Sequence, residues 1–143
     1  MKIIIAADHG GFEFKEKVKQ YLKEQRQEII DVGALEYKGL DGFTEYSGEA
    51  IKRIRETPDS IGIFICGSGV LASMAANRFK GIRAALCHRI EYAVQSREHN
   101  DANVLCLGGR YLELSEAKEI IDAFLTTKFL GGKYKDRIDV LDE

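Results

Sequence analysis

The chain has 143 residues, of which 45% are hydrophobic and 31% charged, and this composition is ordinary for one globular domain spanning 1–143. The formal net charge of −2 supplies no positive field for nucleic acid or an anionic membrane, so neither partner is expected. No apolar run approaches the ~20 residues of a membrane span. The three cysteines have no metal-ligand spacing and indicate reduced thiols, which favours a cytoplasmic protein without a metal or other cofactor.

Short apolar runs alternate with amphipathic stretches along the chain. The apolar runs predict β-strands at Lys2–Ala7, Glu28–Val32, Ile61–Ile65, Ile82–Leu86 and Asn103–Leu107. Helices are expected between the strands and after the last one, because apolar residues recur there with helical spacing. The alternation indicates an α/β fold, a single-domain Rossmann-like three-layer sandwich with about five parallel strands in the order 2-1-3-4-5. A polar C-terminal tail begins at about Gly131.

Two polar loops are expected to meet at one edge of this sheet. Ligands of doubly wound sheets bind at the carboxyl ends of the strands, where the winding reverses, and here that point lies between the first and third strands. The first strand ends in Asp8-His9-Gly10-Gly11, and the third ends in Cys66-Gly67-Ser68-Gly69. The sequence therefore predicts a ligand site that combines these two loops.

The loop after the third strand admits three interpretations. Gly67–Ala72 fits the G-x-G-x-x-G/A pattern of dinucleotide-binding loops, although the next strand ends without the acid that would bind a ribose hydroxyl. Cys66 could instead fill the core, as we expect of Cys87 and Cys106, which have no glycine loop beside them. Third, Cys66 could be a base for proton transfer at carbon, with the loop amides stabilising an enediolate oxygen.

Several motifs together carry a resemblance to a known family. They are Ala7-Asp8-His9-Gly10-Gly11, Ile65-Cys66-Gly67-Ser68-Gly69, Ala75-Ala76-Asn77, Gly81-Ile82-Arg83-Ala84 and the run from Ser96 to Val104. The chain resembles ribose-5-phosphate isomerase type B, in the wider group that includes the galactose-6-phosphate isomerases, nearly from end to end. The resemblance implies a metal-free aldose–ketose isomerisation of a sugar phosphate through a cis-enediolate, carried out by a homodimer or a tetramer of dimers.

The resemblance also implies roles for individual residues. Cys66 resembles the base that moves a proton between C1 and C2 of the sugar, Ser68 stands where the family usually has threonine, and His99 resembles the group that opens the furanose ring. The oxyanion site would consist of the amides of Gly67, Gly69, Val70 and Leu71 with Asn100. The remaining substrate contacts would be Asp8 for a sugar hydroxyl or the ring oxygen, and His9, Arg110, Lys133 and Arg137 for the phosphate.

Each of these residues also has a purely structural interpretation. Asp8 could cap the turn after the first strand, and His9 and His99 could be surface histidines. Arg110 and Arg137 could be solvated charges, which is the default for an arginine.

Three stretches depart from the family pattern. Leu71 stands where the family commonly has glycine, and Gly42-Phe43 replaces Tyr-Pro after Asp41, which is expected to free that loop. Lys133-Tyr134 replaces Arg-His in the tail, and lysine binds phosphate as a point charge without the two-pronged geometry of guanidinium. These changes are expected to alter substrate size and phosphate affinity rather than the reaction class.

The position of His99 creates a geometric conflict. His99 precedes the fifth strand, so in a parallel sheet it lies at the amino end of the strands, opposite Cys66. We therefore expect His99 and Asn100 to reach the site of a partner subunit, which would make the homodimer obligatory for turnover.

The sequence as a whole favours an isomerase that interconverts ribose 5-phosphate and ribulose 5-phosphate, a reaction of the pentose phosphate pathway. An isomerase of another aldose phosphate, of four or six carbons, is the alternative within the class. A non-catalytic flavodoxin-like module that binds a nucleotide or a phosphorylated ligand is the alternative outside it.

Overall fold

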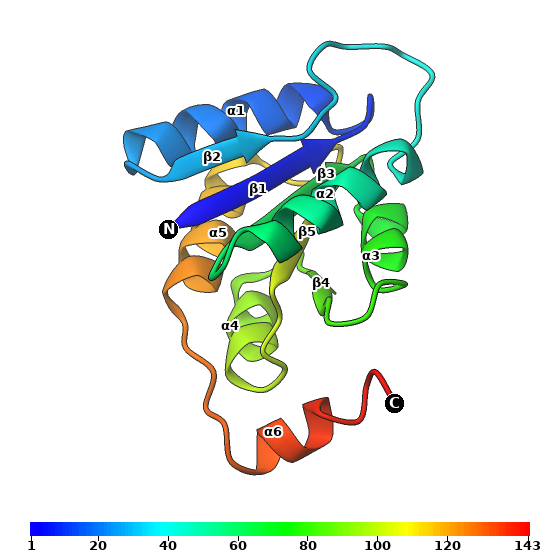
Figure 1. The fold of residues 1–143 in the computed structure, drawn as a ribbon. Coiled ribbons are helices and arrows are strands. Elements are labelled where there is room, and N and C mark those ends of the chain that lie inside the picture. Colours follow the sequence, from blue (N-terminus) through cyan, green and yellow to red (C-terminus); the bar gives the residue numbers. More distant parts are fainter.

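The structure is a computed structural model that describes all 143 residues, and its centre is a parallel β-sheet. The strands are β1 (Lys2–Ala7), β2 (Glu28–Asp31), β3 (Ile61–Cys66), β4 (Ala84–Leu86) and β5 (Val104–Gly108). They are ordered β2-β1-β3-β5-β4 (Figure 1). The predicted α/β three-layer fold with five parallel strands is confirmed.

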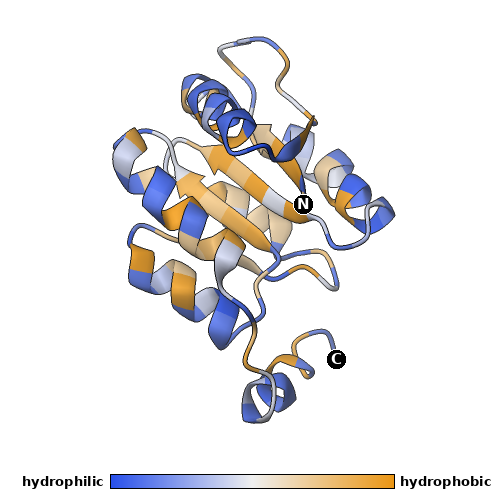
Figure 2. Cartoon of the chain, turned by 90° about the vertical axis from the view of Figure 1, so that its left-hand side faces the viewer, coloured by the Kyte–Doolittle hydropathy of each residue, from blue (hydrophilic) through white to orange (hydrophobic).

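Helices cover both faces of the sheet. One face carries α1 (Phe12–Glu24), α4 (Ile90–Glu98) and α5 (Leu114–Thr126), and the other carries α2 (Thr44–Glu56) and α3 (Val70–Ala76). The strands are the most hydrophobic part of the chain, whereas the helices turn hydrophilic residues outward (Figure 2). Side chains of β1 alternate between two apolar clusters, with Ile3 and Ile5 on the α1 side and Ile4 and Ala6 on the α2 side. No helix is both long enough and apolar enough to cross a membrane.

The predicted strand order is wrong for the last two strands, because β5 lies between β3 and β4. β5 is buried along its whole length and pairs with β3 from Val104 to Gly108, whereas β4 has three residues that are all half-buried, as suits an edge strand. The chain passes from β3 to β4 over the α3 face and returns to β5 over the α4 face, which keeps both crossovers right-handed. The loop after β5 therefore lies beside the loop after β3.

Two of the three cysteines are confirmed as core residues. Cys87 and Cys106 are fully buried, and neither forms a disulfide. Burial raises the pKa of Cys87 to about 11 and raises the pKa of Cys106 well above its ordinary value. Neither thiol is suited to act as a base at neutral pH.

The C-terminal tail lies apart from the three layers (Figure 1). Its helix α6 (Lys133–Ile138) has no buried residue, in agreement with the polar tail expected from the sequence. The Leu130 N–H donates to the carbonyl of Glu98 (3.1 Å), and the Gly81 N–H donates to the Asp142 carboxylate (2.8 Å). These contacts hold the tail at the amino end of the sheet.

A buried lysine fixes the turn after β2 against the end of β1. Lys15 is fully buried, and its Nζ donates to both carboxylate oxygens of Asp31 (3.0 Å each) and to the Ala34 carbonyl. Burial acts against the charged form of Asp31, but hydrogen bonds from Lys19 and Lys15 outweigh it and hold the pKa of Asp31 below its ordinary value. The Ala34 N–H in turn donates to the carbonyl of Ala7 (2.7 Å), one residue before the Asp8 loop.

We expect Lys15→Met to destabilise the fold by about 3–5 kcal/mol at pH 7, because it leaves a buried carboxylate short of its partner. Because the pKa of Asp31 is lowered, its ionised form stabilises the folded state at neutral pH, and this stabilisation is lost as the pH falls from about 5 toward 2. In urea unfolding across this pH range, the free energy of unfolding should fall less steeply with decreasing pH in the variant than in wild type. Lys23→Met is the control, with an expected change of about 0.5 kcal/mol or less, because this lysine of α1 is exposed and does not contact Asp31. Wild-type stability in Lys15→Met would contradict this account.

Candidate active site

The carboxyl ends of β1, β3 and β5 converge, as predicted for the first two of them. Ala7 pairs with Ile65 in the sheet and Cys66 pairs with Gly108, so the loops that follow start side by side. Gly10 approaches the next loop so closely that an added Cβ would lie 2.9 Å from the amide nitrogen of Gly67. The loop after β5 joins them, because Gly109 N–H donates to the Cys66 carbonyl (2.9 Å).

Cys66 lies beneath the turn that ends β3. Cys66 is 4% exposed as a residue, and its side chain packs with that of Phe64 on the α2 side of the sheet. Its Sγ accepts a hydrogen bond from Gly69 N–H at 3.1 Å. Gly69 has φ +79°, and an added Cβ would lie 2.5 Å from Leu86, so this turn requires glycine. A backbone donor is thus aimed at the sulfur, and the other cysteines have no such turn beside them.

Two amides of the predicted oxyanion loop already donate hydrogen bonds within the chain. The amide of Gly69 already donates to Cys66 Sγ, and that of Val70 donates to Ser68 Oγ (3.1 Å). Neither amide is free to receive an oxyanion in this arrangement. Val70 and Leu71 are 42% and 43% exposed, so the bulk of Leu71 lies at the surface of α3.

Asp8 is the buried acid at the end of β1. It is 7% exposed, and its Oδ1 accepts a hydrogen bond from Gly10 N–H (3.0 Å). Burial raises the pKa of Asp8, and the nearby Asp41 carboxylate adds to this effect, although the Gly10 hydrogen bond and His9 oppose it. Asp8 and Cys66 both face the α2 side of the sheet, since each extends the register from Ala6 and Phe64 by two residues.

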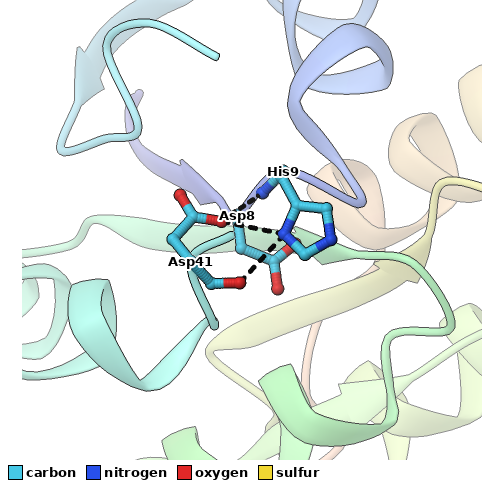
Figure 3. Close-up of side chains that lie close together, drawn as sticks. All are labelled: Asp8, His9 and Asp41. Atoms are coloured by element: carbon cyan, nitrogen blue, oxygen red, sulfur yellow. Dashed lines mark hydrogen bonds and ion pairs between the residues drawn. The ribbon is translucent and has the colours of Figure 1, made fainter. Parts of the chain in front are cut away.

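Asp41 is a site residue that the sequence reasoning missed. It accepts a hydrogen bond from the His9 backbone N–H (2.7 Å), and its carboxylate lies 3.0 Å from His9 Nδ1 (Figure 3). The hydroxyl of Tyr46 also donates to this carboxylate. Asp8, His9 and Asp41 offer donor atoms within 4.8 Å of one another, a spacing that a metal ion could bridge. The protein's own hydrogen bonds already engage His9 Nδ1 and both carboxylate oxygens of Asp41.

The loop that carries Asp41 is anchored, and the expectation that Gly42-Phe43 frees it is wrong. The Phe43 side chain is fully buried, and its ring lies 5.3 Å from that of Phe64. Phe43 therefore ties the end of the loop into the core beside β3.

A cleft of about 360 Å³ opens beside the loops that follow β1 and β5. It is lined by His9, Gly10, Glu13, Phe14, Lys17, Tyr37, Gly109 and Arg110. Two of the predicted phosphate ligands, His9 and Arg110, thus share one cleft. The Arg110 guanidinium lies against the loop after β3, because a Cβ on Gly67 would be 2.9 Å from its Nη1. Lys17 is a further cation in this cleft, and no motif singled it out.

The other predicted ligands lie at the opposite end of the sheet. His99 ends α4 and stacks on Tyr134 of the tail, with ring centroids 4.3 Å apart and planes 8° from parallel. Lys133 and Arg137 lie near the same tyrosine ring, 5.2 and 5.6 Å from its centroid. Asn100 and Arg137 line a separate cavity of about 490 Å³ beside β4. Within one chain the structure keeps this group away from Cys66. The sequence predicted this separation for His99 and Asn100 only.

The fold and its relatives define the class of protein, a sugar phosphate isomerase. The ribose/galactose isomerase family matches residues 3–141. A Mycoplasma pneumoniae protein named probable ribose-5-phosphate isomerase B is 42% identical over 136 residues, which cover 95% of this chain and 90% of that protein. The chain belongs to the ribose/galactose isomerase family, and by homology it is an enzyme of the ribose-5-phosphate isomerase B type.

Solved structures agree with this assignment. A crystal structure of a ribose 5-phosphate isomerase from Thermotoga maritima matches with a TM-score of 0.94 at 42% identity, covering 99% of this chain and 97% of that one. Ribose-5-phosphate isomerase B from Mycoplasma genitalium, solved with bound ribulose-5-phosphate, matches with a TM-score of 0.91 at 37% identity, covering 96% and 91%. The resemblance found in the sequence is confirmed, and the alternative of a non-catalytic nucleotide-binding module is removed.

We expect Asp8→Asn to stabilise the protein at pH 7. Because burial raises the pKa of Asp8, ionising this carboxyl costs the folded state free energy as the pH rises through the folded-state pKa. Asparagine keeps the acceptor for Gly10 N–H without the charge. Thermal unfolding should show a higher Tm for the variant at pH 7 and no gain below about pH 3.5, where the carboxyl is protonated in both states. The exposed Asp136→Asn is the control, and a lower Tm for Asp8→Asn at pH 7 would contradict the argument.

Proposed function

We propose that this protein interconverts D-ribose 5-phosphate and D-ribulose 5-phosphate through a cis-enediolate, with Cys66 as the base. One observation carries the proposal: the Arg110 guanidinium of the cation-lined cleft lies against the loop that holds Cys66. A phosphate bound in the cleft would place the sugar carbons over that loop. The bound ribulose-5-phosphate in the Mycoplasma genitalium relative supports this choice of substrate.

In the proposed reaction, Cys66 takes the proton from C2 of the open-chain aldose, and the charge left behind is shared with O1 in the enediolate. The same sulfur returns a proton to C1, while the Ser68 hydroxyl carries a proton from O2 to O1. The Gly69 N–H, 3.1 Å from Sγ, stabilises negative charge on the sulfur before the transfer. The amides of Gly67 and Leu71, which are engaged by neither Cys66 Sγ nor Ser68 Oγ, would donate to the enediolate oxygen. Asp8, beside this loop, would bind a sugar hydroxyl.

Phosphate binding is assigned to the α1 side of the strand ends. Arg110 offers a planar fork that matches two phosphate oxygens, and His9 of the same cleft offers a ring nitrogen. Lys17 contributes a further positive charge from the second turn of α1. No metal or organic cofactor takes part in this scheme.

The groups at the amino end are proposed to serve a second subunit. His99, Asn100, Lys133 and Arg137 gather around Tyr134 and the cavity beside β4, remote from the Cys66 of their own chain. In a homodimer, or a tetramer of such dimers, this group would complete the partner's cleft. His99 would then open the furanose ring by general acid–base catalysis, and the cations would bind the phosphate.

We expect Cys66→Ser to lower kcat for ribose 5-phosphate by at least about 10²-fold, since a serine hydroxyl is a far weaker base at neutral pH. The matched control is Cys87→Ser, which alters a buried cysteine of the apolar cluster on the other face of the sheet and should keep most of the activity. Ketose formation is assayed with aldose phosphates of four, five and six carbons, after circular dichroism has verified folding. Near-normal turnover by folded Cys66→Ser would refute Cys66 as the base. A preference for an aldose phosphate of four or six carbons would refute ribose 5-phosphate as the substrate.

We also expect two inactive variants to restore activity when their subunits mix. In hybrids of Cys66→Ala with His99→Ala, one of the two shared sites has both wild-type groups, so up to about half of the activity per hybrid dimer should return. Subunit exchange is verified by native mass spectrometry of differently tagged chains. Exchange without any recovered activity would reject shared sites and leave His99 without a route to the substrate.

A further inference from the structure

Asp41 and Tyr46 have no part in the proposed reaction, yet hydrogen bonds connect them to His9, which lines the cleft. Asp41 ends the loop between β2 and α2, and its side chain is 2% exposed. Tyr46 stands in the first turn of α2 and is 9% exposed. A buried acid is costly unless its charge is satisfied, so the partners of Asp41 indicate what it does.

The contacts of Asp41 determine where His9 carries its hydrogen. His9 Nδ1 lies 2.9 Å from the Asp41 backbone carbonyl and 3.0 Å from the Asp41 carboxylate. Both oxygens only accept hydrogen bonds, so Nδ1 must be protonated. Nε2 is the nitrogen that remains for the cleft, and Figure 3 shows it on the side of the ring away from Asp41.

Tyr46 completes the arrangement from the far side. Its hydroxyl donates to the second carboxylate oxygen of Asp41, while its ring lies against Gly33, where an added Cβ would be 2.8 Å from Cδ1. Burial acts against the charge on Asp41, but the hydrogen bonds from Tyr46 and His9 outweigh it and hold its pKa below the ordinary value. Burial and the Asp41 charge raise the pKa of Tyr46, so its hydroxyl remains a donor at neutral pH.

We propose that Asp41 and Tyr46 are positioning residues that hold the His9 ring with Nδ1–H on Asp41 and Nε2 aimed at the substrate phosphate. This inference rests on the proposed function in assigning the phosphate to the cleft. A ring that carries hydrogen on both nitrogens donates from Nε2 to a phosphate oxygen while Nδ1–H stays on Asp41. The other charges around His9 are Asp8 at the strand end and Glu13, Lys17 and Arg110, which line the same cleft.

The kinetic test is a double-mutant cycle. Asp41→Asn is expected to raise both KM for ribose 5-phosphate and Ki for inorganic phosphate about tenfold, equivalent to ~1.4 kcal/mol, with a smaller change in kcat. Tyr46→Phe should act in the same direction more weakly. In a His9→Asn background, which lacks Nε2, Asp41→Asn should add nothing further. Glu49→Gln, an exposed charge change on α2, is the control. Unchanged KM and Ki in Asp41→Asn, or a full additional loss in the His9→Asn background, would overturn the proposal.

A spectroscopic test covers the case in which Asp41→Asn fails to fold. The chain has three histidines, so the ¹⁵N signals of His9 can be assigned and its protonated nitrogen identified. Wild type and Tyr46→Phe should both show hydrogen on Nδ1, and a bare Nδ1 in wild type would overturn the proposal. Calorimetric titration with inorganic phosphate separates the two proposals. If phosphate binding weakens in Asp41→Asn while no aldose phosphate is isomerised by wild type, the proposed function fails and the positioning role stands.

Discussion

The contact between the loops after β3 and β5 is the constraint on which the candidate site depends. Hydrogen bonds from Gly109 and Arg110 N–H to the carbonyls of Cys66 and Gly67 place the Arg110 side chain over the cysteine loop. This contact exists because β5 lies next to β3 in the sheet. Had β4 occupied that place, the loop beginning at Cys87 would stand beside Cys66, and the cation-lined cleft would not form at the switch point.

The site holds two buried carboxyl groups, Asp8 and Asp41, whose surroundings shift their pKa values. Burial and the nearby Asp41 charge both raise the proton affinity of Asp8, while Asp41 itself is held ionised by Tyr46 and His9. The two carboxyls thus have pKa values displaced in opposite directions by their surroundings, which is typical of functional sites. Lys15 forms an ion pair with Asp31 at the end of β2. This ion pair stabilises the turn after β2, next to the loops that carry Asp8 and Asp41.

Much of this architecture could be predicted from the sequence, and the exceptions have physical reasons. The apolar runs located all five strands, and glycine-rich strand ends located the meeting of the Asp8 and Cys66 loops. The order of β4 and β5 was missed because it depends on which strand is buried on both faces, and the predicted runs Ile82–Leu86 and Asn103–Leu107 have the same length. Asp41 was missed because its partner His9 lies 32 residues away, across a loop without periodicity. Phe43 was misjudged because burial of a loop residue depends on tertiary packing, here against Phe64.

In the proposed mechanism, the reaction takes place at one end of each chain, and the groups at the other end serve a partner subunit. A crystal structure of the complex with ribulose 5-phosphate tests this most directly. The account predicts the phosphate between His9 Nε2 and the Arg110 guanidinium, C1 and C2 within about 3.5 Å of Cys66 Sγ, and a partner's tail closing the cleft. A phosphate bound instead in the cavity of Asn100 and Arg137, with the sugar remote from every Cys66 in the assembly, would contradict it.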